Sequence, residues 1–231
     1  FADKLGWVVH GVCSKEHTLT LGGTVMPLCQ RNTGIYAGFL ATVLTLFALG
    51  RSHAAKLPPR PIWLLLLFNV VWMGIDGFNS LFLDMGIWHP YTPQPVLRIL
   101  SGLAMGMSMG IMLLFAFNLT VRADARRDQP IVGSWRDIGI IAAIELLLFV
   151  LIQLAGTIIA YPLAIFSTIG ILLVMFSVNV MLVSMVTRYE GSITKLAQLA
   201  RPGMVALILT AVEFGALAWG RIVLERSLGI S

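Results

Sequence analysis

Two cysteines and two histidines near the start of the chain carry side chains that can bind a metal ion or form a disulfide. His10, Cys13, His17 and Cys29 occur in the pattern H-x2-C-x3-H-x11-C. Two thiolates and two imidazoles could complete a tetrahedral zinc site, although this spacing differs from the common zinc-finger patterns. A disulfide between Cys13 and Cys29 is the simpler interpretation, and two unconnected thiols are a further one.

Three acidic residues fall inside long apolar runs, where a carboxylate is costly and marks a functional or structural site. They are Asp76, Glu145 and Glu213. Arg98 follows Asp76 across a short loop, so we predict a structural ion pair between these two residues. The alternatives are a proton or ligand site at Asp76, or an Asp76 side chain that faces outward into solvent.

Glu145 and Glu213 have no evident basic partner within their own apolar runs. We predict that both carboxyl groups form hydrogen bonds with amide side chains of other helices, which is a packing role. The alternative is a proton or cation pathway through the bundle. Asn69 and Ser80 share a helical face with Asp76, and together with the two glutamates they form a candidate intramembrane polar site.

The elements that must position these side chains are apolar helices. Hydrophobic residues make up 58% of the 231 residues and charged residues only 12%, whereas a soluble domain has about 25% charged residues. We predict an all-α, polytopic transmembrane helix bundle of about six spans, with residues 1–231 in a single domain. The expected spans are residues 34–50, 61–83, 96–121, 138–157, 162–187 and 202–224. The turn between the fourth and fifth spans is expected at Gly156–Pro162.

The segment before the first span, residues 1–33, is expected to differ from the bundle. Phe1, Leu5, Val8 and Val12 recur at helical spacing within it. An amphipathic helix of this kind lies on the membrane surface, and Trp7 would anchor it in the interface. We therefore predict a short N-terminal interfacial helix that carries the cysteines and histidines close to the membrane.

Lysine and arginine residues concentrate in the first, third and fifth loops between the predicted spans. Because basic loops stay on the cytoplasmic side, both ends of the chain are predicted on the outer face of the membrane. We expect a multi-pass protein of the bacterial cytoplasmic (inner) membrane, with the lipid bilayer as a partner. The net charge of +5 comes largely from these loops, and no basic helix indicates a nucleic-acid partner.

Gly102, Gly106 and Gly110 form a G-x-x-x-G-x-x-x-G stripe in the third predicted span. Small residues at this spacing allow two helices to pack closely in a membrane. The stripe predicts a close helix contact, and the partner helix could belong to this chain or to another subunit.

Short motifs in the first half of the chain resemble an uncharacterised family of bacterial integral membrane proteins. Pro27–Tyr36 reads P-L-C-Q-R-N-T-G-I-Y, and the family has P-L-C-x-R-C-T-G-I-Y. Asp76-Gly77, preceded by isoleucine, and Leu97–Gly102 are similar to the family's I-D-G and L-R-x-x-[TS]-G motifs. The family is known as domain of unknown function 2085, and the resemblance implies a membrane fold and topology but no activity.

The chain departs from this family at two positions that could matter for chemistry. The family's second cysteine is Asn32 here, and the histidine expected after its first cysteine is Ser14. A metal or dithiol site built on those groups would lack ligands in this chain. The departures therefore weaken a redox or metal role for the N-terminal segment.

The sequence contains no G-x-S-x-G, H-E-x-x-H or P-loop pattern, so it does not favour an enzyme. We favour a structural or accessory subunit of a larger membrane protein complex, with other membrane protein subunits as partners. One alternative is a small proton- or ion-coupled transporter or channel that uses the intramembrane carboxylates. Another is a redox or metal-binding membrane protein that uses the N-terminal cysteines and histidines. The sequence requires no cofactor, and bound lipid is expected.

Overall fold

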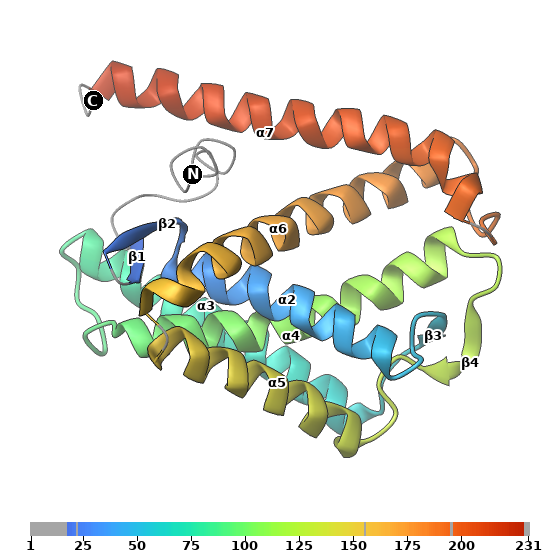
Figure 1. Cartoon of the computed structure of the whole chain (residues 1–231), viewed down its shortest axis with the longest axis horizontal. Helices are drawn as coiled ribbons and strands as arrows, with labels where there is room; N and C mark the ends of the chain where they lie inside the picture. The colour runs from blue at the N-terminus through green and yellow to red at the C-terminus, as the bar shows by residue number, and fades with distance from the viewer. Residues whose placement is uncertain (1–17, 22, 155, 195, 229–231) are drawn as a thin grey trace.

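The computed structural model describes residues 18–21, 23–154, 156–194 and 196–228, and it is a bundle of long α-helices (Figure 1). In chain order the long helices are α2 (Gln30–Ala48), α3 (Arg60–Asp84), α4 (Pro95–Val121), α5 (Trp135–Leu154), α6 (Gly156–Val186) and α7 (Ala200–Leu228). A short 3-10 helix, η2 (Leu196–Leu199), precedes α7. The predicted helix bundle is confirmed, and each predicted span corresponds to one of these long helices.

Five of the described helices, α3 to α7, are long and apolar enough to cross a membrane. The helix that does not meet this description, α2, packs against α4, α6 and α5. Many of its residues are buried inside the bundle. Because other helices cover α2, it needs fewer apolar residues than a helix that faces lipid.

A close helix contact joins α2 to α4 along the predicted glycine stripe. A Cβ atom at Gly102 or Gly106 would clash with the backbone of α2, and one at Gly110 would lie 3.0 Å from Thr42. On the other side of the contact, a Cβ atom at Gly34 would lie 2.7 Å from a backbone oxygen of α4. The partner of the stripe is therefore a helix of this same chain.

The prediction from the sequence includes the glycines of α4 but not their counterpart on α2. Gly34 and Gly38 form a second G-x-x-x-G pattern, and a Cβ atom at Gly38 would lie 3.0 Å from the carbonyl oxygen of Leu103. Gly170 of α6 also approaches α2, since a Cβ atom there would clash with the backbone of Tyr36. Glycines on three helices thus bring α2, α4 and α6 into backbone contact.

The turn between α5 and α6 is much shorter than predicted. α5 ends at Leu154 and α6 begins at Gly156, whose φ of +49° lies in the left-handed region that glycine adopts without steric cost. Pro162, which was expected to close the turn, lies inside α6. The predicted extension of the turn to Pro162 is therefore wrong: Pro162 is the seventh residue of α6, where it removes one backbone hydrogen bond without ending the helix.

An antiparallel β-hairpin precedes α2, and it is not among the predicted elements. β1 (Thr18–Leu21) pairs with β2 (Thr24–Cys29), and Gly23 in the turn has a φ of +82°. The hairpin buries Leu19, Leu21 and Met26 in a cluster with residues at the start of α6. Gly-Gly between alternating residues is a recognised hairpin signal, so the hairpin was readable from the sequence. The predicted interfacial helix falls on residues outside the described part of the chain.

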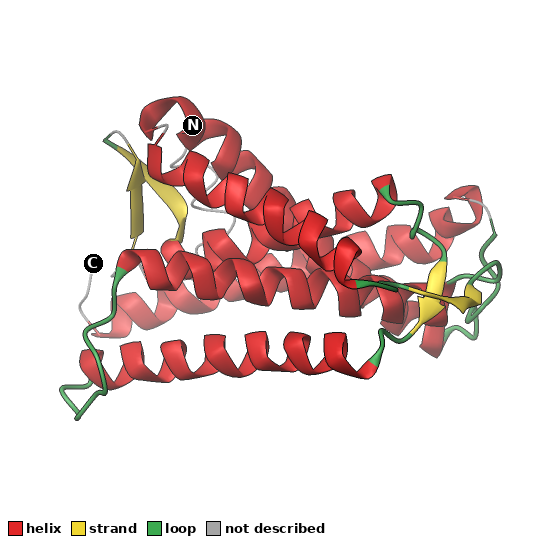
Figure 2. Cartoon of the chain, turned by 90° about the horizontal axis from the view of Figure 1, so that it is seen from below, coloured by secondary structure: helices red, strands yellow, loops and turns green. Residues whose placement is uncertain are grey.

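A second small sheet lies at the opposite end of the helices (Figure 2). β3 (Ala54–Lys56) pairs in parallel with β4 (Arg126–Pro130). This pairing joins the connection between α2 and α3 to the connection between α4 and α5. Asn118 Nδ2 donates a hydrogen bond of 2.9 Å to the carbonyl oxygen of Ala54. Arg51 and Asp137 form an ion pair of 3.1 Å beside the sheet. These contacts hold the connections of four helices together.

α7 is the helix that is least enclosed by the others. It packs against α6 and runs along the edge of the molecule at the top of Figure 1. Large apolar side chains are exposed along much of its length, among them Leu207, Val212 and Trp219. In a membrane this surface faces lipid or another protein.

Candidate functional site

The acid that α3 carries inside the bundle, Asp76, is paired with Arg31 at the start of α2. Arg31 Nη2 donates a hydrogen bond of 2.6 Å to Asp76 Oδ2, and Arg31 Nε donates to the same oxygen over 3.2 Å. The side chain of Asp76 is 1% exposed and that of Arg31 is 20% exposed. Charge-assisted bonds of this length are among the stronger hydrogen bonds in proteins. The pair therefore links α2 to α3 at the end of the bundle that carries the β1–β2 hairpin.

Three further side chains complete the hydrogen bonding around this pair. The Tyr91 hydroxyl donates to Asp76 Oδ1 over 2.8 Å, and the Ser101 hydroxyl donates to Asp76 Oδ2 over 3.2 Å. Ser80 accepts a bond of 3.0 Å from Arg31 Nη2 and donates one of 3.0 Å to the Asp76 carbonyl oxygen. The carboxylate is thus held from α2, from the α3–α4 loop and from α4. We call Arg31, Asp76, Ser80, Tyr91 and Ser101 the Asp76 cluster.

Arg98 has a different place from the one predicted. The predicted Asp76–Arg98 ion pair is wrong, because Arg31 holds the carboxylate instead. Arg98 is only 7% exposed, and its Nε atom is buried without a hydrogen-bond partner among the described residues. It faces a cavity of ≈ 210 Å³ beside the Asp76 cluster, lined by Arg31, Gly77, Ser80, Leu81, Asp84 and Arg98. We call this space the Arg98 cavity.

The boundary of α2 explains why Arg31 was not recognised as the partner of Asp76. The predicted first span begins at residue 34, which leaves Arg31 in the segment before the bundle. α2 begins at Gln30, so Arg31 lies in its first turn and points into the bundle. The signal that could have found it is the basic residue within the motif of Pro27–Tyr36, which resembles the family pattern.

Tyr91 closes the Asp76 cluster from the loop between α3 and α4. Burial, together with the hydrogen bond to the Asp76 carboxylate, raises the pKa of Tyr91 to about 12. Asn79 holds the backbone of this loop, because its Nδ2 atom donates to the Tyr91 carbonyl oxygen over 2.8 Å. The phenol therefore remains a hydrogen-bond donor to Asp76 at neutral pH.

Glu145 and Asn69 each lie in a separate helix contact. Glu145 of α5 is 6% exposed, and the Thr42 hydroxyl of α2 donates a hydrogen bond of 3.0 Å to its Oε1 atom. The Glu145 carboxyl lies against Gly38, where a Cβ atom would come within 3.2 Å of Oε1. Asn69 of α3 donates to the Ser108 hydroxyl of α4 over 3.2 Å. These are interhelical contacts between α5 and α2 and between α3 and α4.

Glu213 lies in the middle of α7 and is half-buried against α6. Asn179 Nδ2 donates a hydrogen bond of 2.8 Å to Glu213 Oε2, and the same atom donates to the Thr210 hydroxyl over 3.0 Å. Glu145, Glu213, Asn69 and Ser80, the candidate intramembrane polar site, therefore lie in four different surroundings. The structure does not bring them together into one site.

The predicted zinc ligands His10, Cys13 and His17 lie outside the described residues, and so does one half of the predicted Cys13–Cys29 disulfide. Cys29 is described, and it occupies the N-cap position of α2 and lines the Arg98 cavity. Across residues 18–21, 23–154, 156–194 and 196–228, no group of three or more histidine, cysteine and acidic side chains could hold a metal ion.

A polar cluster of a different kind lies at the β3–β4 end of the bundle. His53 Nδ1 lies 2.9 Å from Asp124 Oδ2, and Arg122 Nε donates to Asp124 Oδ1 over 3.0 Å. The hydrogen bond from Arg122 is the main reason why the pKa of Asp124 is lowered. These exposed or half-exposed groups connect the α2–α3 loop to the α4–α5 loop, and they line none of the cavities described for this structure.

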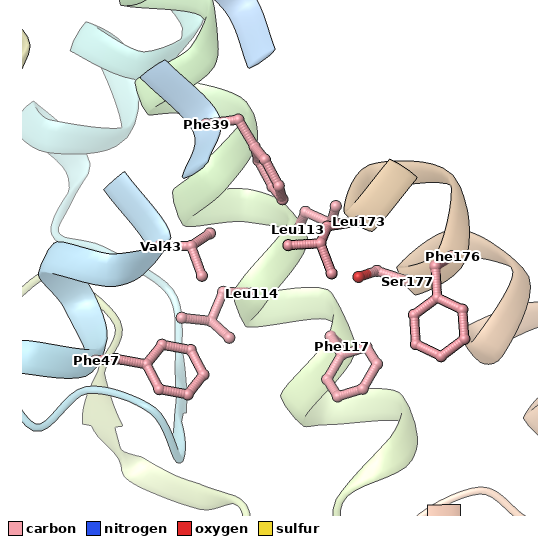
Figure 3. Close-up of a pocket in the computed structure, with 9 residues that line it drawn as sticks. All are labelled: Phe39, Val43, Phe47, Leu113, Leu114, Phe117, Leu173, Phe176 and Ser177. Atoms are coloured by element: carbon pink, nitrogen blue, oxygen red, sulfur yellow. The ribbon is translucent and has the colours of Figure 1, made fainter. Parts of the chain in front are cut away.

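An apolar cavity of ≈ 250 Å³ lies between α2, α4 and α6 (Figure 3). Phenylalanine and leucine side chains surround it, and the Ser177 hydroxyl is the one polar group among the labelled side chains. Such a lining offers no pair of acidic, basic or nucleophilic side chains within hydrogen-bond distance of each other. It suits an acyl chain or a packing side chain rather than chemistry.

The Asp76 cluster is therefore the best-organised polar site among the described residues. Its carboxylate is balanced by Arg31 and surrounded by donors, which suits an electrostatic clamp between helices. The arrangement holds α2, α3 and α4 together at one end of the bundle.

The Asp76 cluster lies within a region of the chain that matches a known protein family. Residues 13–112 match the model of a family described as a predicted membrane protein (DUF2085), which confirms the resemblance seen in the sequence motifs. In space these motifs meet, because Arg31 contacts Asp76 and the backbone of Arg31 lies against Gly102. Neither the curated proteins nor the solved structures yield a significant match. The chain is a multi-pass membrane protein whose matched region contains the whole Asp76 cluster.

Proposed function

We propose that this chain is a structural or accessory subunit of a larger membrane protein complex, and that it binds its partner along α6 and α7. The observation that carries the proposal is the half-buried carboxyl group of Glu213 in the middle of α7. Among the described residues its hydrogen-bond partner is Asn179, which reaches Oε2 alone. A partly exposed carboxyl group at this depth is costly in lipid. A helix of another subunit that offers a donor would remove this cost.

An apolar groove lined by Thr210, which shares Asn179 with Glu213 as a hydrogen-bond donor, suits such a helix. The groove has a volume of ≈ 330 Å³ between α6 and α7, and Leu172, Phe214 and Gly215 are among its lining residues. A Cβ atom at Gly215 would meet nothing within 4 Å, so the described part of the chain does not pack against this glycine. Small residues on a membrane-facing surface allow a second helix to approach closely.

Asp76 and Glu145 differ from Glu213, because the helices of this chain enclose both of them more completely. Asp76 is balanced by Arg31, and Glu145 is buried under a hydrogen bond from Thr42. Both acids thus hold helices of this chain to one another. Glu213 differs because its surroundings are incomplete without something outside α6 and α7.

The proposal includes a location and an orientation. We place the chain in a bacterial cytoplasmic membrane, with the β3–β4 end of the bundle on the cytoplasmic side. The basic residues of the connections at that end, such as Arg126, Arg127 and Arg136, support this orientation. The β1–β2 hairpin and both ends of the chain then face outward.

A proton- or ion-coupled transporter is a weaker alternative. The three acids lie in three separate helix contacts, and no chain of hydrogen bonds that we describe joins them. Proton flux measured in proteoliposomes would distinguish the two functions. A flux that falls in both Glu145→Gln and Glu213→Gln relative to the native chain would favour transport over a subunit role.

The main test is extraction of the native membrane in a mild detergent, followed by purification through a tag on this chain. We expect other membrane proteins to be recovered in a fixed stoichiometric ratio. Gly215→Leu should reduce their recovery at least tenfold, because the leucine fills the groove. Gly74→Leu on α3 is the matched control, since a Cβ atom at Gly74 also meets nothing within 4 Å.

Two results would contradict the proposal. One is a monodisperse species that contains this chain alone, or only copies of this chain, after mild extraction. The other is equal recovery of the partners with Gly215→Leu and with Gly74→Leu, which would remove α7 from the interface.

A further inference from the structure

The Arg98 cavity contains a buried cationic group that nothing in the Asp76 cluster satisfies. Arg98 is 7% exposed, and its Nε atom has no hydrogen-bond partner within the described part of the chain. A buried guanidinium N–H group that lacks an acceptor is costly, because it gives up water without a replacement. Asp76, the acid predicted for it, is already held by Arg31. The cavity therefore places a guanidinium N–H group that lacks an acceptor among the described residues at the end of the membrane-spanning bundle.

The surroundings of Arg98 favour an oxyanion. Arg31 lines the same cavity, so a second guanidinium group lies nearby. Cys29 at the N-cap of α2 is a further lining residue, and its side chain makes no capping hydrogen bond. The free N–H groups at the start of a long helix attract anions. Gly77 keeps space open beside Arg31, since a Cβ atom there would lie 3.9 Å from Nη1.

One acid limits the charge that the cavity can accept. Asp84, the last residue of α3, lines the cavity and is exposed. Its carboxylate would repel a doubly charged phosphate monoester more strongly than a singly charged phosphodiester. A phosphodiester also matches the planar, bidentate donor geometry of arginine.

The position of the cavity indicates a membrane lipid as the source of this group. Leu81 lines the cavity and is 48% exposed on the surface of α3. The loop that follows α3 presents Met85, Ile87 and Trp88 outward, and Trp88 is 79% exposed. Exposed tryptophan at the end of a membrane helix is typical of the headgroup region. We propose that the Arg98 cavity binds the phosphodiester headgroup of a membrane phospholipid, with Arg98 as the main ligand.

The test measures lipid binding to the purified full chain in detergent micelles. Native mass spectrometry and thermal unfolding would be recorded with dioleoylphosphatidylglycerol, with dioleoylglycerol, which lacks the phosphodiester, and with inorganic phosphate. We expect the phospholipid to bind and raise the unfolding temperature, and the other two compounds to have little effect. Arg98→Gln should weaken phospholipid binding at least tenfold.

Arg136→Gln is the matched control, because Arg136 is an exposed arginine in the first turn of α5 at the opposite end of the bundle. Leu81→Trp provides a second variant that narrows the cavity from the exposed surface without changing a buried charge. It should also weaken phospholipid binding while the free chain keeps its stability.

Three outcomes would overturn the inference. Phospholipid binding could be the same in Arg98→Gln, Leu81→Trp and the native chain. Dioleoylglycerol could bind as well as the phospholipid, which would show that acyl chains alone are recognised. Inorganic phosphate could stabilise the chain as strongly as the phospholipid, which would make the ligand a free anion. The inference does not depend on the proposed partner at α7, so either one can fail alone.

Discussion

The Tyr91 hydroxyl donates a hydrogen bond of 2.8 Å to Asp76 Oδ1, on the carboxylate that Arg31 holds through its other oxygen. The loop between α3 and α4 is thereby tied to the ion pair between α2 and α3. Ser101 adds α4 to the same carboxylate. One buried acid thus fixes three helices and a loop, and its contacts make several quantitative predictions.

The first prediction concerns the ionisation of Tyr91. Its pKa in the folded chain is raised to about 12 from its ordinary value of 10.0, so the folded state keeps the proton more firmly than the unfolded state does. Its contribution to stability is therefore complete below pH 10 and is lost as the pH rises from about 10 to about 12. Ultraviolet titration of the native chain minus that of Tyr91→Phe should show a phenol that ionises near pH 12. A difference spectrum that titrates near pH 10 would contradict this.

The second prediction concerns the Arg31–Asp76 pair. Arg31→Met should lower the free energy of unfolding by about 3–5 kcal/mol, because it leaves a buried carboxylate unpaired. Asp76→Asn in the same chain should recover part of this loss, since the asparagine needs no counter-charge. Reversible unfolding in mixed micelles would measure both, with Arg136→Met as a control expected within about 0.5 kcal/mol of the native chain. Strictly additive losses in the double variant would show that the two side chains do not interact.

The third prediction concerns the glycines between α2 and α4. Gly106→Ala should lower the free energy of unfolding by about 1–3 kcal/mol, because the new methyl group meets the backbone of α2. Gly74→Ala places the same methyl group in open space, so it should be neutral or stabilise by up to about 1 kcal/mol through helix propensity. The two variants would be compared by the same unfolding measurement. Similar effects at both positions would argue against the close contact of α2 with α4.

The sequence predicts the positions of the helices better than it predicts which side chains meet between them. Hydropathy located the central part of each helix, because the length of a membrane span is a strong constraint, but it placed the start of α6 at residue 162 instead of Gly156. It could not identify the partner of Asp76, since Arg31 and Arg98 lie at the same end of the bundle and only packing distinguishes them. The start of α2 at Gln30 was obscured because α2 is covered by other helices and its first turn is polar. Local turn chemistry at Gly23 and Pro162 was misread for a different reason, namely that long apolar runs dominated the interpretation.

The fourth prediction concerns the cysteines, which remain an expectation from the sequence because Cys13 lies outside the described residues. If Cys13 and Cys29 form a disulfide, the intact mass should increase by that of two hydrogens upon reduction. A tryptic digest without reductant should also contain the two cysteine peptides as one linked species. Alkylation of both thiols without prior reduction would contradict the disulfide, and bound zinc in the same sample would favour the metal site instead.

The polar first turn of α2 also bears on how the chain is made. α2 carries Arg31 and is not among the helices apolar enough to cross a membrane. Its acidic partner lies 45 residues later, on α3, and the glycines that cover its backbone lie on α4. When α2 leaves the ribosome, neither its charge nor its exposed backbone has a partner. We therefore expect stable insertion of this helix to follow translation of α3 and α4, which supply both partners.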